Sequence, residues 1–258
     1  MSDSGRDFVL VAEDTAAAIA AATIVDRVIH ERGEQWQRDL WDDEQRATHR
    51  RWRSLRTDSH ARAIDGVGTF STKQNVAPDR KITLAPGRGG VAVEVAKFFA
   101  ALDEADERAT LAVFACDLDG QERSSALSEH DERVQRAKKN GNARADCFVI
   151  ALAQPEFEAW FIAGFTAQTT DEQRRLEEQR RACGFDPCAN PEQLHSNSNG
   201  PRDAKNVLEA LCASRKVADE RVRACVERCP LDVLETRGEA AGVRRFTEQI
   251  TRELLPAL

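Results

Sequence analysis

The chain contains no tyrosine among its 258 residues and only one methionine. Without a tyrosine hydroxyl, this chain alone has no means of attacking a phosphate through tyrosine and staying attached to the product. No apolar run approaches the length of a membrane span, and the amino terminus lacks the charged and apolar regions of a signal peptide. We therefore expect a cytoplasmic protein that does not cross a membrane.

The composition is that of a globular chain with a mildly acidic surface. Hydrophobic residues make up 41% of the sequence, enough for a sizeable core, and the net charge of −7 leaves room only for a local basic patch. The seven cysteines are odd in number and scattered, which favours free thiols. A zinc site from Cys183, Cys188, Cys225 and Cys229 is disfavoured, because neither spacing is the two-residue knuckle.

Apolar runs and helical patterns alternate along the first part of the chain. Strands are predicted at 8–12, 81–84, 112–115 and 147–153, and helices at 16–29, 91–102 and 124–139, with a further helix beginning within 154–160. Nearly all-apolar strands that alternate with helices indicate an α/β fold, with a parallel sheet covered by helices on both faces. We predict an α/β domain over 1–165, with a charged helical insert at about 31–62, and a helical C-terminal region over 166–258.

Acidic side chains follow three of the predicted strands. Glu13 follows the first, Asp117 and Asp119 follow the third, and Glu156 and Glu158 follow the fourth. Carboxyl ends of parallel strands meet at one edge of a sheet, where ligands bind. Carboxylates held that close repel one another unless a cation lies between them, so the pattern predicts a site for Mg²⁺ or Mn²⁺. The alternative is a turn in which Asp117 and Asp119 cap backbone N–H groups.

The order of these motifs resembles the TOPRIM fold, which topoisomerases, bacterial primases and the OLD-family nucleases share. The resemblance rests on Val11-Ala12-Glu13-Asp14-Thr15 and on Asp117-Leu118-Asp119. In addition, Pro155-Glu156-Phe157-Glu158-Ala159-Trp160 is similar to the Pro-Glu-x-Glu-Ala-Trp motif of a little-characterised bacterial family of TOPRIM-like proteins related to the OLD nucleases. Those proteins also carry a later Asp-x-Lys helix, which Asp203-Ala204-Lys205 resembles.

The resemblance implies metal-dependent hydrolysis of nucleic acid by water. Its catalytic residues would be Glu13, Asp117, Asp119, Glu156, Glu158 and Lys205. Of these, Glu13, Asp117 and Asp119 would hold Mg²⁺ or Mn²⁺, and Lys205 would steady the reacting phosphate or protonate the leaving oxygen. The resemblance also implies a role in bacterial defence, partnership with an ATPase subunit, and a TOPRIM-like sheet. An ordinary solvated lysine is the alternative for Lys205.

Arginines supply the candidate contacts to a nucleic-acid backbone. Arg50, Arg51 and Arg53 lie in a cluster beside Trp52, and Arg88 lies in a glycine-rich turn. A solvated face and a tight turn are the respective alternatives.

Two other functions stay open at this stage. One alternative to a nuclease is a non-catalytic TOPRIM-like scaffold, and the other is a flavodoxin-like module that binds Mg²⁺ for signalling or interaction. The sequence does not decide between DNA and RNA, between internal and terminal cutting, between one metal and two, or among oligomeric states.

Overall fold

The computed structural model describes residues 6–12, 15–40, 50–54, 67–69, 109–118, 132, 139, 145–196, 200–214 and 219–258. Within this part, the five strands are β1 (Arg6–Ala12), β2 (Arg50–Ser54), β3 (Val67–Thr69), β4 (Ala109–Asp117) and β5 (Ala145–Ala153). They form one parallel sheet in the order β3-β2-β1-β4-β5. The α/β fold and the parallel sheet are therefore as predicted.

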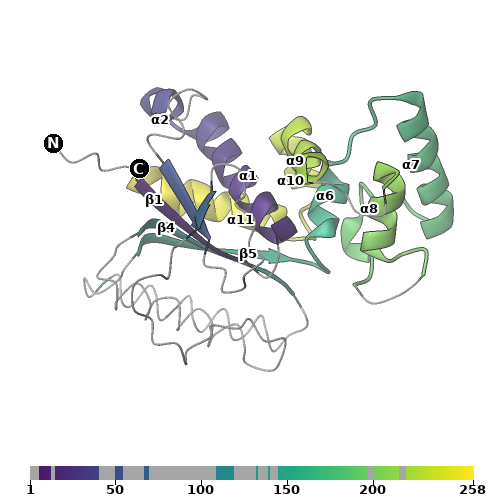
Figure 1. The fold of residues 1–258 in the computed structure, drawn as a ribbon, viewed down its shortest axis with the longest axis horizontal. Coiled ribbons are helices and arrows are strands. Elements are labelled where there is room, and N and C mark those ends of the chain that lie inside the picture. The colour runs from purple at the N-terminus through teal and green to yellow at the C-terminus, as the bar shows by residue number, and fades with distance from the viewer. Residues whose placement is uncertain are drawn as a thin grey trace.

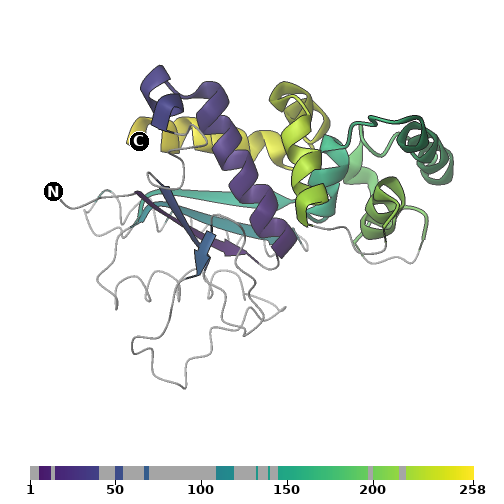
Figure 2. The same ribbon diagram turned by 45° about the horizontal axis from the view of Figure 1, so that its top comes forward.

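The helices begin with α1 (Thr15–Arg32) and α2 (Gln35–Leu40), and continue after β5 with α6 (Glu158–Gly164), α7 (Thr170–Cys183), η1 (Pro191–Gln193), α8 (Ala204–Cys212), α9 (Asp219–Arg228), α10 (Leu231–Arg237), α11 (Val243–Gln249), η2 (Ile250–Leu254) and η3 (Leu255–Ala257). In Figure 1, α6 to α10 gather beside the end of the sheet where β5 leads into α6. Figure 2 shows α1 and α11 layered over one face of the sheet.

The helix α1 lies at the centre of the core. Every residue from Ala17 to Asp26 is buried, as are Val28 and Ile29. A helix that is apolar on nearly all sides must be surrounded by protein, and α1 packs against β1, β4, α9 and α11. Near its end, Arg27 donates hydrogen bonds to the carbonyl oxygens of Val226 and Cys229, which ties α1 to the last turn of α9.

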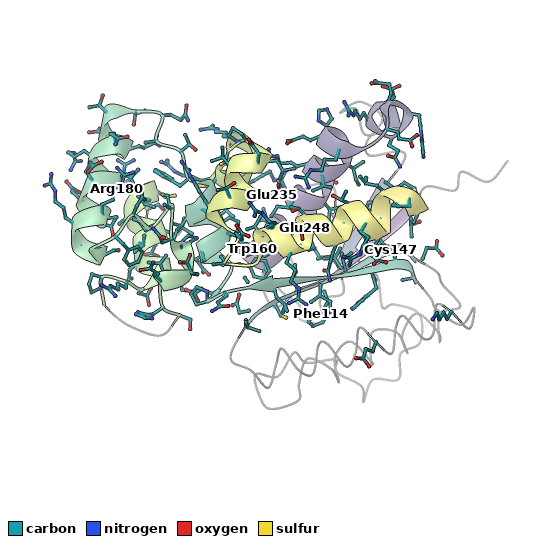
Figure 3. The ribbon with its side chains drawn as sticks, turned by 180° about the vertical axis from the view of Figure 1, so that it is seen from behind. Phe114, Cys147, Trp160, Arg180, Glu235 and Glu248 are labelled. Carbon is teal, nitrogen blue, oxygen red and sulfur yellow. The ribbon has the colours of Figure 1, made fainter. Side chains whose placement is uncertain are left out.

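Both faces of β4 and β5 are buried. Alternate residues such as Val113 and Val149 pack into the same hydrophobic cluster as α1, while Phe114 and Ile150, one position along, are 2% and 4% exposed. Figure 3 shows Phe114 on the side of the sheet away from α11. The nearly continuous apolar sequence of these strands follows from this burial on two sides.

The C-terminal part of the chain packs against the sheet. The helix α11 packs against β5, and the Ile150 backbone N–H donates to Gln249 Oε1 at 3.2 Å, which satisfies a donor on the edge of this strand. One buried cluster extends from Phe8 to Leu258. The domain boundary at 165 stays a prediction, but residues on its two sides share one core.

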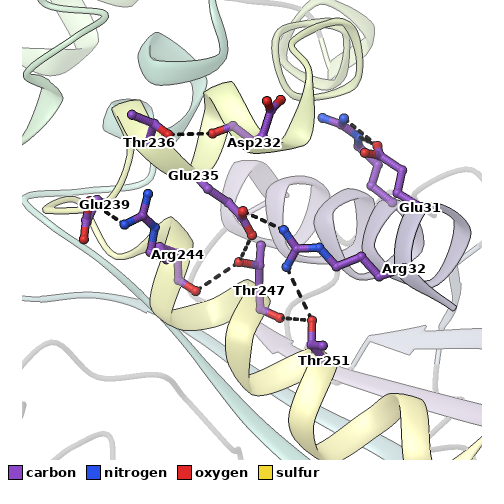
Figure 4. A network of polar contacts seen from close by, with 10 residues as sticks. Glu31, Arg32, Asp232, Glu235, Thr236, Glu239, Arg244, Thr247 and Thr251 are labelled. Atoms are coloured by element: carbon purple, nitrogen blue, oxygen red, sulfur yellow. Dashed lines mark hydrogen bonds and ion pairs between the residues drawn. The ribbon is translucent and has the colours of Figure 1, made fainter.

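A polar network fastens α1, α10 and α11 together (Figure 4). The buried Glu235 accepts a hydrogen bond from Thr247 Oγ1, and its Oε2 lies 2.6 Å from Arg32 Nη2. Thr251 Oγ1 in turn donates to the Thr247 carbonyl oxygen at 2.8 Å. A buried carboxylate is tolerated here because both of its oxygens have partners.

The prediction of a helix over 31–62 is wrong at β2. The chain forms α2 and then a strand whose residues pair with β1 on one side and β3 on the other. Backbone pairing with both neighbouring strands, β1 and β3, outweighs the low strand propensity of this arginine-rich segment. The predicted strand at 81–84 and helix at 91–102 lie outside the described residues. No helix in the described part of the chain is long and apolar enough to span a membrane.

Candidate active site

The candidate site lies at the carboxyl ends of β4 and β5. These strands pair up to Asp117, which lies opposite Ala153, and the Leu118 N–H donates to the Ala153 carbonyl oxygen at 2.8 Å. The chain then turns through a cis bond between Gln154 and Pro155. Asp117 is the last residue of β4, and Asp119 lies outside the described residues.

Asp117 contacts the Pro-Glu-x-Glu segment directly. Its Oδ1 accepts a hydrogen bond from the Phe157 backbone N–H at 3.0 Å. This N–H precedes the first turn of α6, where donors lack partners within the helix. The carboxylate of β4 is therefore held beside both Glu156 and Glu158. It also performs the capping role that was the alternative to metal binding, although it caps α6 and not a helix next to it in sequence.

Trp160 anchors this segment in the core. It is fully buried, packs edge-on against Phe157 with ring centroids 4.8 Å apart, and donates from Nε1 to the Ala241 carbonyl oxygen at 2.7 Å. The Gln154 N–H donates to the same carbonyl oxygen at 3.1 Å. Thus the residues before and after Glu156 are fixed to one loop of the C-terminal region.

The loop that receives these bonds passes very close to β5 at Gly242. Gly242 has a φ of 101°, and a Cβ at this position would lie 2.2 Å from the Leu152 carbonyl oxygen. A side chain is excluded by both the left-handed backbone and the contact. Glycine at 242 therefore allows Ala241 to reach Trp160.

The helix α8 brings Lys205 to the site. Asp203 begins the helix by accepting a hydrogen bond from the Asn206 N–H at 2.9 Å, and the apolar face of α8 is buried. Lys205 Nζ then lies 3.2 Å from Glu156 Oε2. The lysine side chain is 58% exposed, whereas the glutamate side chain is 3% exposed. The ion pair therefore links the buried Glu156 carboxylate to an ammonium group that lies at the protein surface.

The charges in this cluster depend on one another. The pKa of Glu156 is raised from 4.5 to about 7, chiefly by burial and then by the negative charge of Glu158, while Lys205 opposes both effects. Burial alone would lower the pKa of Lys205, but the acids Glu158, Glu156 and Asp117 outweigh it and raise that pKa. The cluster thus combines a permanently charged cation with a carboxyl group that titrates near neutral pH.

The donor set has the chemistry that a hard divalent cation requires, but the described residues do not complete a site. Within the part of the chain that the structure describes, the buried Glu156 Oε1 has no hydrogen-bond partner, which is costly unless a proton or a cation satisfies it. No three histidine, cysteine or carboxylate side chains among the described residues converge closely enough to hold a metal ion. A complete magnesium site would need Glu13 and Asp119, which lie outside the described residues.

The arginines predicted to bind nucleic acid lie in two segments, of which the structure describes only one. Arg88 lies outside the described residues. Arg50, Arg51 and Arg53 lie on β2, where Arg53 pairs with Val9, and Val9 pairs with Ala112 on β4. Ala112 is five residues before Asp117, or roughly 16 Å along a strand. In the register of the sheet, Arg53 therefore lies before the level of Asp117, and contact between the β2 arginines and nucleic acid stays a prediction.

Asp203 was not among the predicted site residues, although it belongs to the Asp-x-Lys segment. Its negative charge is among the causes that raise the pKa of Glu156. The signal for it in the sequence was its place in Asp203-Ala204-Lys205, the segment that resembles the Asp-x-Lys helix. The spacing of the cysteines did not indicate a functional residue. Among the described residues, the cysteines form no zinc site.

The raised pKa of Glu156 predicts that stability falls as pH rises. The folded state binds the carboxyl proton more tightly than the unfolded state, so this contribution is complete below about pH 4.5 and is lost as pH rises through about 7. The difference corresponds to at most about 3 kcal/mol. Tm should be measured in EDTA between pH 5 and pH 8. The raised pKa of Glu156 should lower the Tm of the wild type over this range, and this part of the decline should be absent in Glu156→Gln.

The matched control is Glu178→Gln, because the Glu178 side chain is 51% exposed. This variant should keep the wild-type dependence of Tm on pH. If Glu156→Gln and the wild type lose stability in parallel between pH 5 and pH 8, then Glu156 does not carry a raised pKa.

The chain was also compared with known proteins. No protein-family model, no curated protein and no solved structure matches it.

Proposed function

We propose that this chain is a TOPRIM-like nuclease that hydrolyses phosphodiester bonds in nucleic acid with the help of Mg²⁺ or Mn²⁺. The observation that supports this function best is the meeting of Asp117, Glu156 and Lys205 at the carboxyl ends of two parallel strands, with Glu158 in electrostatic range. Open parallel sheets bind ligands at this edge. A bacterial defence role, with an ATPase subunit as partner, follows from the motif resemblance.

The proposed metal ligands are Asp117 with Glu13 and Asp119, with Glu158 as a further carboxylate nearby. The ion would activate a water molecule and neutralise charge on the phosphate. Asp117 is already oriented by the Phe157 N–H, which donates a hydrogen bond to its Oδ1. Positioning of this kind lowers the cost of organising the site at the moment of reaction.

Lys205 is the proposed phosphate-contacting residue. Its raised pKa keeps the ammonium charged, and its exposure makes it reachable by a large substrate. An ammonium has three donors, so it can contact Glu156 and a phosphate oxygen together. Glu156 holds the lysine in place and is too buried to contact a polynucleotide itself.

Cleavage assays test the proposal directly. The protein should be incubated with plasmid, single-stranded DNA and tRNA in Mg²⁺ or Mn²⁺, with and without any ATPase encoded beside its gene. We expect cleavage that EDTA stops, and we expect Asp117→Asn to lower it by at least about 100-fold, because charge stabilisation at the metal is lost. Circular dichroism should show that the variant is folded.

Asp171→Asn is the matched control, since the Asp171 side chain is 79% exposed on α7. It should leave cleavage unchanged. End-labelled substrate on denaturing gels should give fragments and no label migrating with the protein, because water is the attacking group. Label bound to the protein would contradict hydrolysis. No cleavage of any substrate, even with the ATPase, would favour a non-catalytic scaffold.

A further inference from the structure

A cavity of about 290 Å³ lies between α7 and α9, at the opposite end of α6 from the candidate active site. Phe165, which follows the last residue of α6, lines the cavity, whereas Glu156 precedes the first residue of that helix. The carboxylates and the lysine of the candidate active site do not line it. Its volume is close to the lower end of the range for sites that bind small molecules.

The helix α9 presents two arginines to this cavity. Arg221 and Arg228 are seven positions apart, so they lie on one face of the helix, about 20° from each other and roughly 10 Å apart along its axis. Ala224 and Cys225 lie between them on the same face and also line the cavity. Because these two side chains are small, the face forms a recess with a guanidinium group on either side.

Arg228 is exposed, and within the described part of the chain its charge has no carboxylate partner. It is the last residue of α9, where a cation commonly satisfies the final carbonyl groups of a helix. In this helix, however, Arg27 already donates hydrogen bonds to the carbonyl oxygens of Val226 and Cys229. The guanidinium of Arg228 is therefore free to contact an anion in the cavity.

Arg221 is held in place on the other side of the recess. Its Nη2 lies 3.1 Å from Glu172 Oε1, and the other oxygen of Glu172 accepts the backbone N–H groups of Gln168 and Thr169. The ion pair uses one of the five donors of the guanidinium, so Arg221 can contact an anion without leaving Glu172. A cation that is already ordered costs little conformational entropy when a ligand binds.

The other residues of the cavity wall indicate which kind of anion fits. Phe165 and Cys225 are 5% and 8% exposed and give the cavity an apolar floor, which a free phosphate ion would leave uncovered. Glu220 is exposed at the edge of the recess, about 100° around the helix from Arg221. Guanidinium groups match phosphate oxygens, and carboxylates accept hydrogen bonds from the hydroxyl groups of a ribose.

We propose that this cavity binds a small sugar phosphate of the nucleoside monophosphate class. The phosphate lies between Arg221 and Arg228, the sugar hydroxyl groups donate to Glu220, and the remainder of the molecule covers the apolar floor. Since the two arginines balance the phosphate charge, this binding requires no metal ion. The proposal does not depend on nuclease activity.

The test is isothermal titration calorimetry of the intact chain in EDTA, with adenosine 5′-monophosphate, ribose 5-phosphate, adenosine and inorganic phosphate. We expect both sugar phosphates to bind, inorganic phosphate to bind at least about 10-fold more weakly, and adenosine not to bind. At about ten to a hundred times its Kd, adenosine 5′-monophosphate should raise Tm by roughly 3–8 °C. Arg221→Ala and Arg228→Ala should each weaken its binding by about 10-fold or more.

Arg223→Ala is the matched control, because Arg223 lies on the same helix, about 200° around from Arg221, and does not line the cavity. It should bind adenosine 5′-monophosphate as the wild type does. Asp117→Asn should also bind it normally, which separates this cavity from the candidate active site. Circular dichroism of Arg228→Ala should match that of the wild type, since this arginine has no ion pair among the described residues.

Four results would overturn the proposal. They are no binding of either sugar phosphate at millimolar concentration, binding of adenosine or inorganic phosphate as tight as that of adenosine 5′-monophosphate, and binding that both arginine variants leave unchanged. The fourth is tighter binding of a single-stranded oligonucleotide that Arg228→Ala weakens, because the cavity would then belong to a nucleic-acid interface.

Discussion

Replacing Lys205 by methionine is expected to lower the rate of nucleic-acid cleavage by about 10²- to 10⁴-fold, the range typical of a group that transfers a proton or stabilises charge in the transition state. Methionine keeps an unbranched stem but removes the ammonium that lies 3.2 Å from Glu156. The rate should be measured at saturating substrate in Mg²⁺, so that weakened binding is separated from slower chemistry.

Lys139→Met is the matched control, because Lys139 is an exposed lysine in a helix and is not among the proposed site residues. It should cleave as fast as the wild type. Lys205→Arg should recover only part of the rate, since the guanidinium is larger and holds its donors in a fixed plane. If Lys205→Met cleaves normally while Asp117→Asn does not, Lys205 is a structural partner of Glu156 and has no part in the chemistry.

The apolar elements of the fold could be predicted from the sequence because their pattern depends on burial alone. The strand at 8–12 and the helix at 16–29 became β1 and α1, and the runs at 112–115 and 147–153 lie within β4 and β5. The strand β2 was missed because Arg50, Arg51 and Arg53 give no apolar signal. What makes this segment a strand is its position between β1 and β3.

The candidate site was partly predictable for a related reason. Parallel strands end at one edge, so acids that follow strands are brought together, and Asp117 does lie beside the Glu156 segment. The contacts that fix this geometry join residues far apart in the chain. The Ala241 carbonyl oxygen receives the Trp160 N–H, and Gln249 caps the edge of β5 at Ile150. No local pattern in the sequence specifies such pairs.

Trp160→Ala is expected to destabilise the protein by about 3–5 kcal/mol, as is usual when a buried tryptophan is removed from a packed core. The indole is fully buried between Phe157 and Phe246, and its N–H satisfies the Ala241 carbonyl oxygen. Urea unfolding should give this loss with an unchanged slope, and Tm should fall by roughly 10 °C or more.

Trp36→Ala provides the control for Trp160→Ala, because Trp36 is 44% exposed and its replacement should cost less than about 0.5 kcal/mol. Trp160→Phe should lie between the two, since it keeps an aromatic ring but loses the hydrogen bond to Ala241. Because Trp160 also fixes the segment bearing Glu156, Trp160→Ala should slow cleavage even well below its Tm, whereas Trp36→Ala should not. Equal effects of the two alanine variants on stability would mean that Trp160 does not anchor the segment, and the geometry inferred for Asp117, Glu156 and Lys205 would lose its main support.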